Sequence, residues 1–243
     1  MLSYNKLRND PRQFLALTGL TPAEFDRLVT AFCGAYQRRY PTDRTLAGQR
    51  RQRFPGGGRT GVLQPPQQKL LLLLVYLKTY PLQAVLAELF GLSQPGVNYW
   101  LHRLLPVLRV ALDDLGLLPE RDPRHFSQSQ TSPGLPRLII DGTERRRQRP
   151  KNPEKQALHY SGKKKAHCDK NVVVLEVPSQ RIDFLSATCV GKMHDKGIAD
   201  RGPIIYPPGT ILYKDTGFQG YEPAVLRTCQ PKKKAAWGRT HAG

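Results

Sequence analysis

Leu138-Ile139-Ile140-Asp141 is a short apolar run that ends in an aspartate, and Ile211-Leu212-Tyr213-Lys214-Asp215 repeats this pattern further along the chain. Both runs predict strands that end at a carboxylate. Paired carboxylates at the ends of neighbouring strands suit Mg²⁺ or Mn²⁺, because these hard cations take oxygen ligands. Two such ions can activate water and stabilise a leaving 3′ oxygen, which is phosphodiester chemistry. The alternative is that each aspartate only caps a helix or forms a turn.

Other short runs around these two predict further strands. Residues 171–177 and 182–190 are β-branched or apolar and are separated by the turn residues Pro178-Ser179. A short helix is expected to start at the His194-Asp195 step and to connect the third and fourth strands. The second half of the chain is therefore expected to form a sheet with at least one helix.

The first half of the chain is helical by pattern. Apolar residues follow helical spacing between Leu15 and Tyr40, and Thr21-Pro22 with Glu24 forms a start signal. Further short helices are expected over residues 70–78, 82–90, 94–105 and on to 115. The expected fold class is α+β, with helices first and a mixed α/β domain after them.

Two of these helices have the chemistry of a helix-turn-helix. Ala87 is small enough for a close helix crossing, Gly91 can take the positive φ of the turn, and Val97 and Trp100 would bury the second helix. In that geometry the start of the second helix could face a major groove, through Ser93, Gln94, Asn98 and Tyr99. An ordinary helical hairpin gives the same apolar pattern.

The charge of the chain points to a polyanionic partner. The 243 residues include 38 Lys plus Arg against 19 Asp plus Glu, a net charge of +19. DNA, RNA and acidic membrane surfaces fit such a charge, whereas the alternative is a merely basic protein. No segment reaches the roughly 20 apolar residues of a membrane span, and the N-terminus does not resemble a signal peptide. We expect a cytoplasmic, nucleoid-associated protein, or a nuclear one if the source has a nucleus. Its cysteines should be reduced, because no C-x-x-C pair or zinc-ligand spacing is present.

Changes in composition divide the chain. Seven arginines and Pro55-Gly56-Gly57-Gly58 lie between Arg38 and Arg59, which predicts a flexible basic arm, either a solvated linker or a phosphate-contacting segment. A Pro-, Ser- and Gln-rich stretch follows Asp122. The expected domains are an N-terminal helix with the arm over 1–66, a helix-turn-helix region over 67–121, and a catalytic domain over 136–243.

Several ordered blocks resemble one family. They are Ile140-Asp141-Gly142-Thr143-Glu144, His159-Tyr160-Ser161-Gly162-Lys163-Lys164-Lys165, Gly191-Lys192-Met193-His194-Asp195-Lys196 and Tyr213-Lys214-Asp215-Thr216-Gly217-Phe218-Gln219-Gly220-Tyr221, with Phe90-Gly91-Leu92-Ser93-Gln94 in the first half. Together they resemble DDE transposases of the insertion-sequence-five type, relatives of Harbinger-like transposases. The resemblance runs from about Leu15 to Lys234.

This resemblance implies a ribonuclease-H-like core in which Asp141 and Asp215 are catalytic and hold a divalent metal, Mg²⁺ or Mn²⁺. It also implies that the basic residues beside Asp141 contact a DNA backbone. These residues are Arg145, Arg146, Arg147, Arg149, Lys163, Lys164 and Lys165. A solvated basic hairpin is the alternative. His194 and Asp195 match a family block, but we expect them to cap a helix rather than to act in catalysis.

The chain departs from the family at the third carboxylate. The family places a glutamate on a helix beyond the second aspartate, but no Asp or Glu follows Glu222 here, and Glu222 is too close to Asp215 for that role. We therefore expect a catalytic domain truncated at its C-terminus, either a decayed copy or a first-frame product of ribosomal slippage at Lys232-Lys233-Lys234. One sheet face would then be partly uncovered, with lower stability or a partner as the result.

The expected function is that of a transposase polypeptide that binds insertion-sequence DNA ends. With a complete catalytic domain it would perform metal-dependent strand cleavage and transfer. The expected partner is double-stranded DNA at the element ends and the target, with a homo-oligomer or a second reading-frame product as a further partner. The alternative is a catalytically deficient DNA-binding fragment or regulator of transposition. RNA binding lacks support, because no ribonucleoprotein aromatic motif is present.

Overall fold

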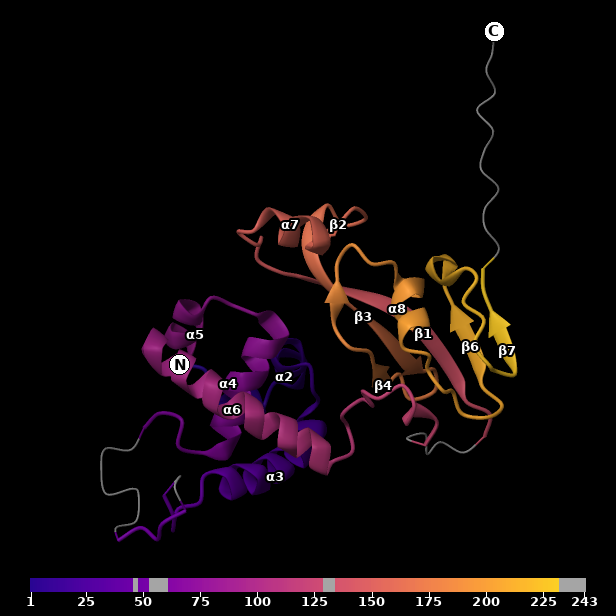
Figure 1. Cartoon of the computed structure of the whole chain (residues 1–243). Helices are drawn as coiled ribbons and strands as arrows, with labels where there is room; N and C mark the ends of the chain where they lie inside the picture. Colours follow the sequence, from indigo (N-terminus) through magenta and orange to yellow (C-terminus); the bar gives the residue numbers. More distant parts are fainter. Residues whose placement is uncertain (46–47, 53–60, 129–133, 232–243) are drawn as a thin grey trace. The chain divides into compact units, whose positions relative to one another are not determined.

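The computed structural model describes residues 1–45, 48–52, 61–128 and 134–231, and it divides the chain into two compact units, Met1–Leu118 and Pro119–Gly243 (Figure 1). Each unit has its own core. The described part of the first unit contains helices and no sheet, and the second contains a mixed sheet. The expected α+β class is therefore confirmed.

The described part of the first unit contains six helices around one apolar core. They are α1 (Tyr4–Leu7), α2 (Pro11–Thr18), α3 (Pro22–Arg39), α4 (Pro66–Thr79), α5 (Gln83–Phe90) and α6 (Gln94–Asp114). Phe14, Phe25 and Phe32 are fully buried, and so are Leu70 to Leu73 on α4. Because α4 is apolar all around, the other helices can pack against several of its sides.

The helix signals in the sequence are confirmed at two places. Thr21 and Glu24 form a complete capping box at the start of α3. Gly91 ends α5 with φ +64°, in the left-handed region. One expectation was wrong: the segments expected to follow one another from Gln94 to Leu115 form the single helix α6. This helix continues through Pro106, because Val107, Leu108 and Ala111 beyond the proline are buried in the core.

The glycines of the expected basic arm, Gly56 to Gly58, lie outside the described residues. The described part of the arm contains one isolated bridge, between Arg44 and Arg50. No helix in the part of the chain that the structure describes is long and apolar enough to cross a membrane.

The sheet of the second unit has the spatial order β2-β3-β1-β6-β7, with β4 and β5 also paired to β3. The strands are β1 (Arg137–Arg146), β2 (Tyr160–Ser161), β3 (Ala166–Glu176), β4 (Ile182–Leu185), β5 (Cys189–Val190), β6 (Ile211–Lys214) and β7 (Arg227–Cys229). Strand β1 is antiparallel to β3 and parallel to β6, and β6 is parallel to β7. This mixed order is consistent with the ribonuclease-H-like fold.

Helices of the second unit lie on the sheet and in a projecting segment. Helix α8 (Asp195–Arg201) packs on β3 and buries Ile198 and Ala199 in the core of the unit (Figure 1). It starts where the sequence predicted. Helix α7 (Pro153–His159) precedes β2 and buries none of its residues. The described residues of this unit also form two 3-10 helices, η1 (Phe126–Gln128) and η2 (Thr216–Phe218).

Two strands are longer than expected, and one is divided. Strand β1 continues six residues past Ile140, because its polar second half pairs with β3 as far as Arg146 opposite Cys168. Strand β3 is extended by the same ladder. The expected strand over 182–190 consists of β4 and β5, which pair with different parts of β3. Asp141 therefore lies in the middle of a strand and not at its end, so this detail of the sequence prediction was wrong.

Candidate active site

Asp141 on β1 and Asp215, the residue directly after β6, lie next to each other across two neighbouring parallel strands. The register pairs Ile140 with Lys214, so each aspartate is the next residue along its own strand. Strands in a sheet are about 4.8 Å apart. Side chains alternate between the two faces, and Leu138, Ile140 and Leu212 are buried on the face that α8 covers. Both carboxylates therefore belong to the opposite face, and both residues are exposed.

Backbone amides next to the two aspartates orient their carboxylates. The Gly142 N–H donates to Asp141 Oδ1 at 2.7 Å, and the Gly217 N–H donates to Asp215 Oδ1 at 2.9 Å. Gln230 Nε2 donates to the Asp215 carbonyl oxygen at 2.5 Å and thereby ties the segment after β7 to this site. Neither carboxylate has an ion-pair partner among the described residues.

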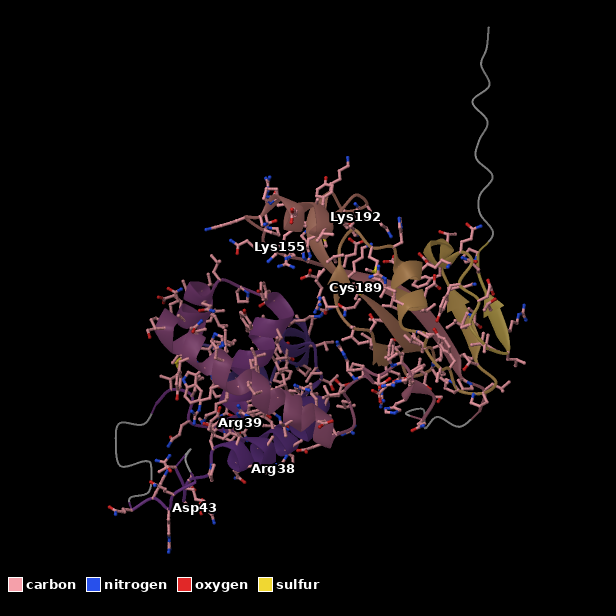
Figure 2. The ribbon with its side chains drawn as sticks, viewed as in Figure 1. Arg38, Arg39, Asp43, Lys155, Cys189 and Lys192 are labelled. Carbon is pink, nitrogen blue, oxygen red and sulfur yellow. The ribbon has the colours of Figure 1, made fainter. Side chains whose placement is uncertain are left out.

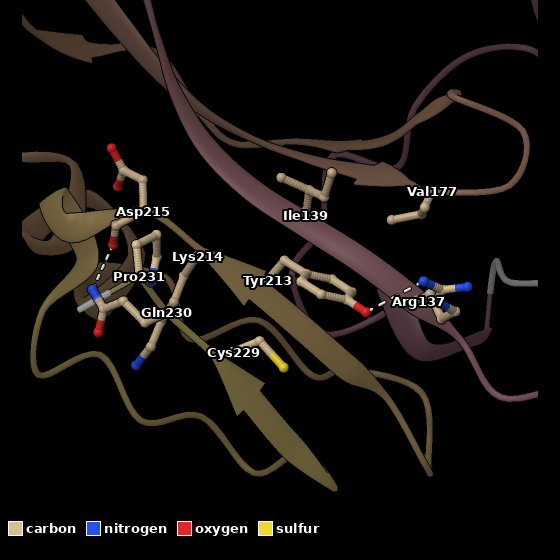
Figure 3. Close-up of a pocket in the computed structure, with 9 residues that line it drawn as sticks. All are labelled: Arg137, Ile139, Val177, Tyr213, Lys214, Asp215, Cys229, Gln230 and Pro231. Atoms are coloured by element: carbon tan, nitrogen blue, oxygen red, sulfur yellow. Dashed lines mark hydrogen bonds between the residues drawn. The ribbon is translucent and has the colours of Figure 1, made fainter.

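The sheet face beside Asp215 contains an open apolar hollow of about 540 Å³ (Figure 3). Ile139, Tyr213 and Cys229 from three adjacent strands form its floor, and Asp215 lies at one end. Ile139 is 38% exposed, and α8, which packs on β3, lies on the opposite face of the sheet.

The donor set fits a hard divalent cation. Mg²⁺ is usually held by one or two carboxylates, with waters and substrate phosphates completing its octahedron. Two exposed, neighbouring carboxylates with no competing cation meet this requirement. Within the described ranges no group of three or more His, Cys, Asp or Glu side chains could hold a metal ion, so the described residues bring no third such side chain to the two carboxylates.

The basic residues after Asp141 fall into two groups. Three arginines are engaged within the unit: Arg145 Nη2 donates to Asn171 Oδ1 at 2.8 Å, Arg147 pairs with Asp169 at 2.9 Å, and Arg149 donates to Gln156 Oε1 at 2.8 Å. The second group is exposed and makes no ion pair in the described part; it consists of Arg146 and of Lys163, Lys164 and Lys165 at the β2–β3 turn.

The segment that carries these lysines is anchored to the sheet. We call α7, β2 and the β2–β3 turn, residues 153–165, the basic projection. The Lys192 N–H donates to the Leu158 carbonyl oxygen at 3.0 Å, and His159 pairs with Asp169 at 2.8 Å. Gly191 packs so tightly that a Cβ there would lie 2.6 Å from the Cys168 carbonyl oxygen and still closer to that of His159.

Two exposed lysines, one in the basic projection and one beside it, were not singled out from the sequence as DNA contacts. Lys155 lies on α7, and Lys192 follows β5 (Figure 2). The hydrogen bond from the Lys192 N–H to the Leu158 carbonyl oxygen joins the segment after β5 to α7. Lys192 belongs to the Gly191–Lys196 block that resembles the transposase family. This block was the one feature of the sequence that could have indicated Lys192 as a DNA contact.

The residues expected to read DNA lie where the helix-turn-helix pattern placed them. Ser93 caps α6 by accepting a hydrogen bond from the Gly96 N–H at 3.2 Å. Val97 is fully buried, whereas Gln94, Asn98 and Tyr99 are exposed on the first turns of α6. Tyr99 is 56% exposed.

The roles expected for His194 and Asp195 were wrong. His194 occupies the N-cap position of α8 without a side-chain capping bond, and the Asp195 carboxylate turns toward the sheet. Asp195 Oδ1 lies 3.3 Å from Lys170 Nζ, and Lys170 also pairs with Glu144 at 3.3 Å. Burial alone would raise the pKa of the Glu144 carboxyl, but the Ser161 hydroxyl and the Lys170 ammonium outweigh it and lower the pKa.

The strand order, the paired aspartates and the first-turn geometry of α6 define the class: a helix-turn-helix region joined to a ribonuclease-H-like domain. Residues 62–114 match the model described as the helix-turn-helix of DDE superfamily endonuclease, and residues 140–241 match the model described as DDE superfamily endonuclease. The chain belongs to the DDE superfamily endonucleases. No curated protein and no solved structure matches it significantly.

These two domains are those of a transposase-type protein that binds and cleaves DNA. DDE superfamily endonucleases use divalent metal ions, which agrees with the two exposed carboxylates.

Proposed function

We propose that this chain is a transposase polypeptide of the insertion-sequence-five or Harbinger-like type that acts on nucleoid DNA. The observation that carries the proposal is the register of β1 and β6, which brings Asp141 and Asp215 to adjacent positions on one sheet face. The two carboxylates would hold Mg²⁺ or Mn²⁺, and the bound ion would activate the attacking water and stabilise the leaving 3′ oxygen.

The chain's own residues would then place the DNA. In the first unit Gln94, Asn98 and Tyr99 would contact base edges of an element end, with Ser93 at the phosphate backbone. In the second unit Lys163, Lys164 and Lys165 would neutralise phosphates of the strand to be cleaved, together with Arg146. Arg145, Arg147 and Arg149, whose side chains bind Asn171, Asp169 and Gln156, would hold the exposed basic residues in position for the DNA backbone.

The second candidate is a DNA-binding regulator without cleavage activity. It is favoured by the carboxylate count, because the described residues place two carboxylates at the site and no third. We propose that a third carboxylate comes from outside these residues, either from a second reading-frame product or from another copy in a homo-oligomer. The open apolar face beside Asp215 supports such an association.

A nicking assay on DNA that carries the element ends separates the two candidates. The chain is compared with Asp141→Ala and Asp215→Ala in Mn²⁺, alone and mixed with the second reading-frame product. Cleavage by the chain alone that both variants abolish supports the enzyme. Cleavage that needs the second product supports completion by a partner. DNA binding without cleavage under either condition refutes the enzyme and leaves the regulator.

A further inference from the structure

A buried group of three charged side chains lies beneath the sheet position of Asp141. Lys170 Nζ on β3 is 3.3 Å from Glu144 Oε1 on β1 and 3.3 Å from Asp195 Oδ1 on α8. The side chains of Lys170 and Glu144 are 8% and 6% exposed, and that of Asp195 is 17% exposed. The β1–β3 register places Glu144 directly opposite Lys170, so the strand pairing itself brings these two charges together.

Asp195 also touches the residue that follows Asp141. A Cβ at Gly142 would lie 2.6 Å and 2.7 Å from the two carboxylate oxygens of Asp195, which is closer than real Cβ atoms approach. The Asp195 carboxylate can therefore lie against β1 at this position only because residue 142 is a glycine. The Gly142 N–H in turn donates to Asp141 Oδ1 at 2.7 Å. Lys170, Asp195, Gly142 and Asp141 thus form a continuous chain of contacts from one face of β1 to the other.

Stability alone gives little reason for this arrangement. A buried ion pair loses much of its attraction to desolvation, and an apolar side chain of similar size often serves the fold equally well. What the charged group provides is a defined geometry, because Lys170 holds Asp195 in one place and Asp195 limits the movement of Gly142. The amide that orients the Asp141 carboxylate is then fixed before a metal ion arrives.

We propose that Asp195, held by Lys170, is a positioning residue for Asp141. It acts through the Gly142 backbone and does not ligate the metal, because it lies on the sheet face opposite the two carboxylates. This inference rests on the proposed function of Asp141 as a metal ligand. Outer-shell partners of metal sites typically change metal affinity by about tenfold or more when they are removed.

The test measures Mn²⁺ affinity of the full chain by electron paramagnetic resonance of free Mn²⁺, with thermal unfolding recorded for every variant. The variants are Gly142→Ala, Asp195→Ala and Asp195→Asn. The matched control is Asp200→Asn on the same helix, where Asp200 pairs with Lys196 at the surface. We expect Gly142→Ala and Asp195→Ala to bind Mn²⁺ about tenfold more weakly. Asp195→Asn keeps the shape and an oxygen acceptor, so it should recover part of the affinity.

Each outcome decides the inference. If Asp195→Ala binds Mn²⁺ as tightly as the unmodified chain, the positioning role of Asp195 is refuted. The same conclusion follows if the Asp200→Asn control loses as much Mn²⁺ affinity as Asp195→Ala. A merely structural role predicts that affinity falls only as far as the melting temperature does, and that Asp195→Asn, if it folds normally, binds like the unmodified chain. If Asp141→Ala binds Mn²⁺ as tightly as the unmodified chain, Asp141 is not a metal ligand. The proposed function is then refuted, and so is this inference, which rests on it.

Discussion

Replacing Lys163, Lys164 and Lys165 together by alanine should make DNA binding less sensitive to salt. The three ammonium groups are exposed at the β2–β3 turn and form no ion pair in the described part of the chain, so they are available to phosphates. Each neutralised phosphate contributes about 0.9 to the slope of log K against log salt. Three contacts therefore contribute about 2.7. Doubling the salt from about 0.1 to 0.2 M should weaken the unmodified chain roughly sixfold more than the variant.

Fluorescence anisotropy of a labelled duplex, titrated at several salt concentrations, measures this slope directly. The matched control is Lys196→Ala, because Lys196 already pairs with Asp200 at 2.5 Å and has less charge to offer to DNA. Circular dichroism checks that each variant is folded. A triple variant with the slope of the unmodified chain would refute the assignment of this turn to the DNA backbone. If Lys196→Ala lowers the slope of log K against log salt by as much as each lysine of the triple variant does, the effect belongs to any surface charge and not to this turn.

Three further predictions follow from local geometry. Gly191→Ala should destabilise the second unit by about 1–3 kcal/mol or more, because its Cβ meets two backbone oxygens, whereas Gly162→Ala has open space and should be nearly neutral; thermal unfolding compares them. Ser93→Ala should cost the first unit about 1 kcal/mol, whereas Ser93→Asp keeps the helix cap and should weaken DNA binding through charge repulsion, as unfolding and anisotropy would show. Folding lowers the pKa of the Glu144 carboxyl from its ordinary 4.5. The contribution of this carboxylate to the free energy of unfolding is therefore present above pH 4.5 and is lost as the pH falls through the pKa of the folded state. A Glu144→Gln variant should lose less stability in acid than the unmodified chain, as thermal unfolding at several pH values would show.

The helical half of the protein was largely predictable because its signals are local. The capping box of Thr21 and Glu24 and the left-handed Gly91 depend on residues within one or two turns. The wrong division of α6 arose at Pro106, where burial of the residues beyond it outweighs the intrinsic cost of proline. The burial of that segment depends on the other helices of the core. The short helix α1 and the start of α2 at Pro11 were also missed.

The sheet was less predictable at its polar positions. The apolar runs before Asp141 and Asp215 correctly indicated strands, because alternation and β-branching are local properties. The continuation of β1 to Arg146 was not visible, since those residues are polar and gain strand structure only from the ladder with β3. The same ladder engages Arg145 with Asn171, so the basic run after Asp141 is not a single free surface.

The sequence by itself determined the family blocks, the basic charge, the helix-turn-helix turn and the two aspartates, because each of these is a matter of residue type and short spacing. Only the tertiary structure decided which carboxylates share a face and which charges are buried. Asp195 shows the difference: at the start of a helix its sequence context predicted capping, but the packing of α8 directs its carboxylate to Gly142 and Lys170. The physical reason is that burial and pairing depend on segments distant in the chain, which only folding brings together.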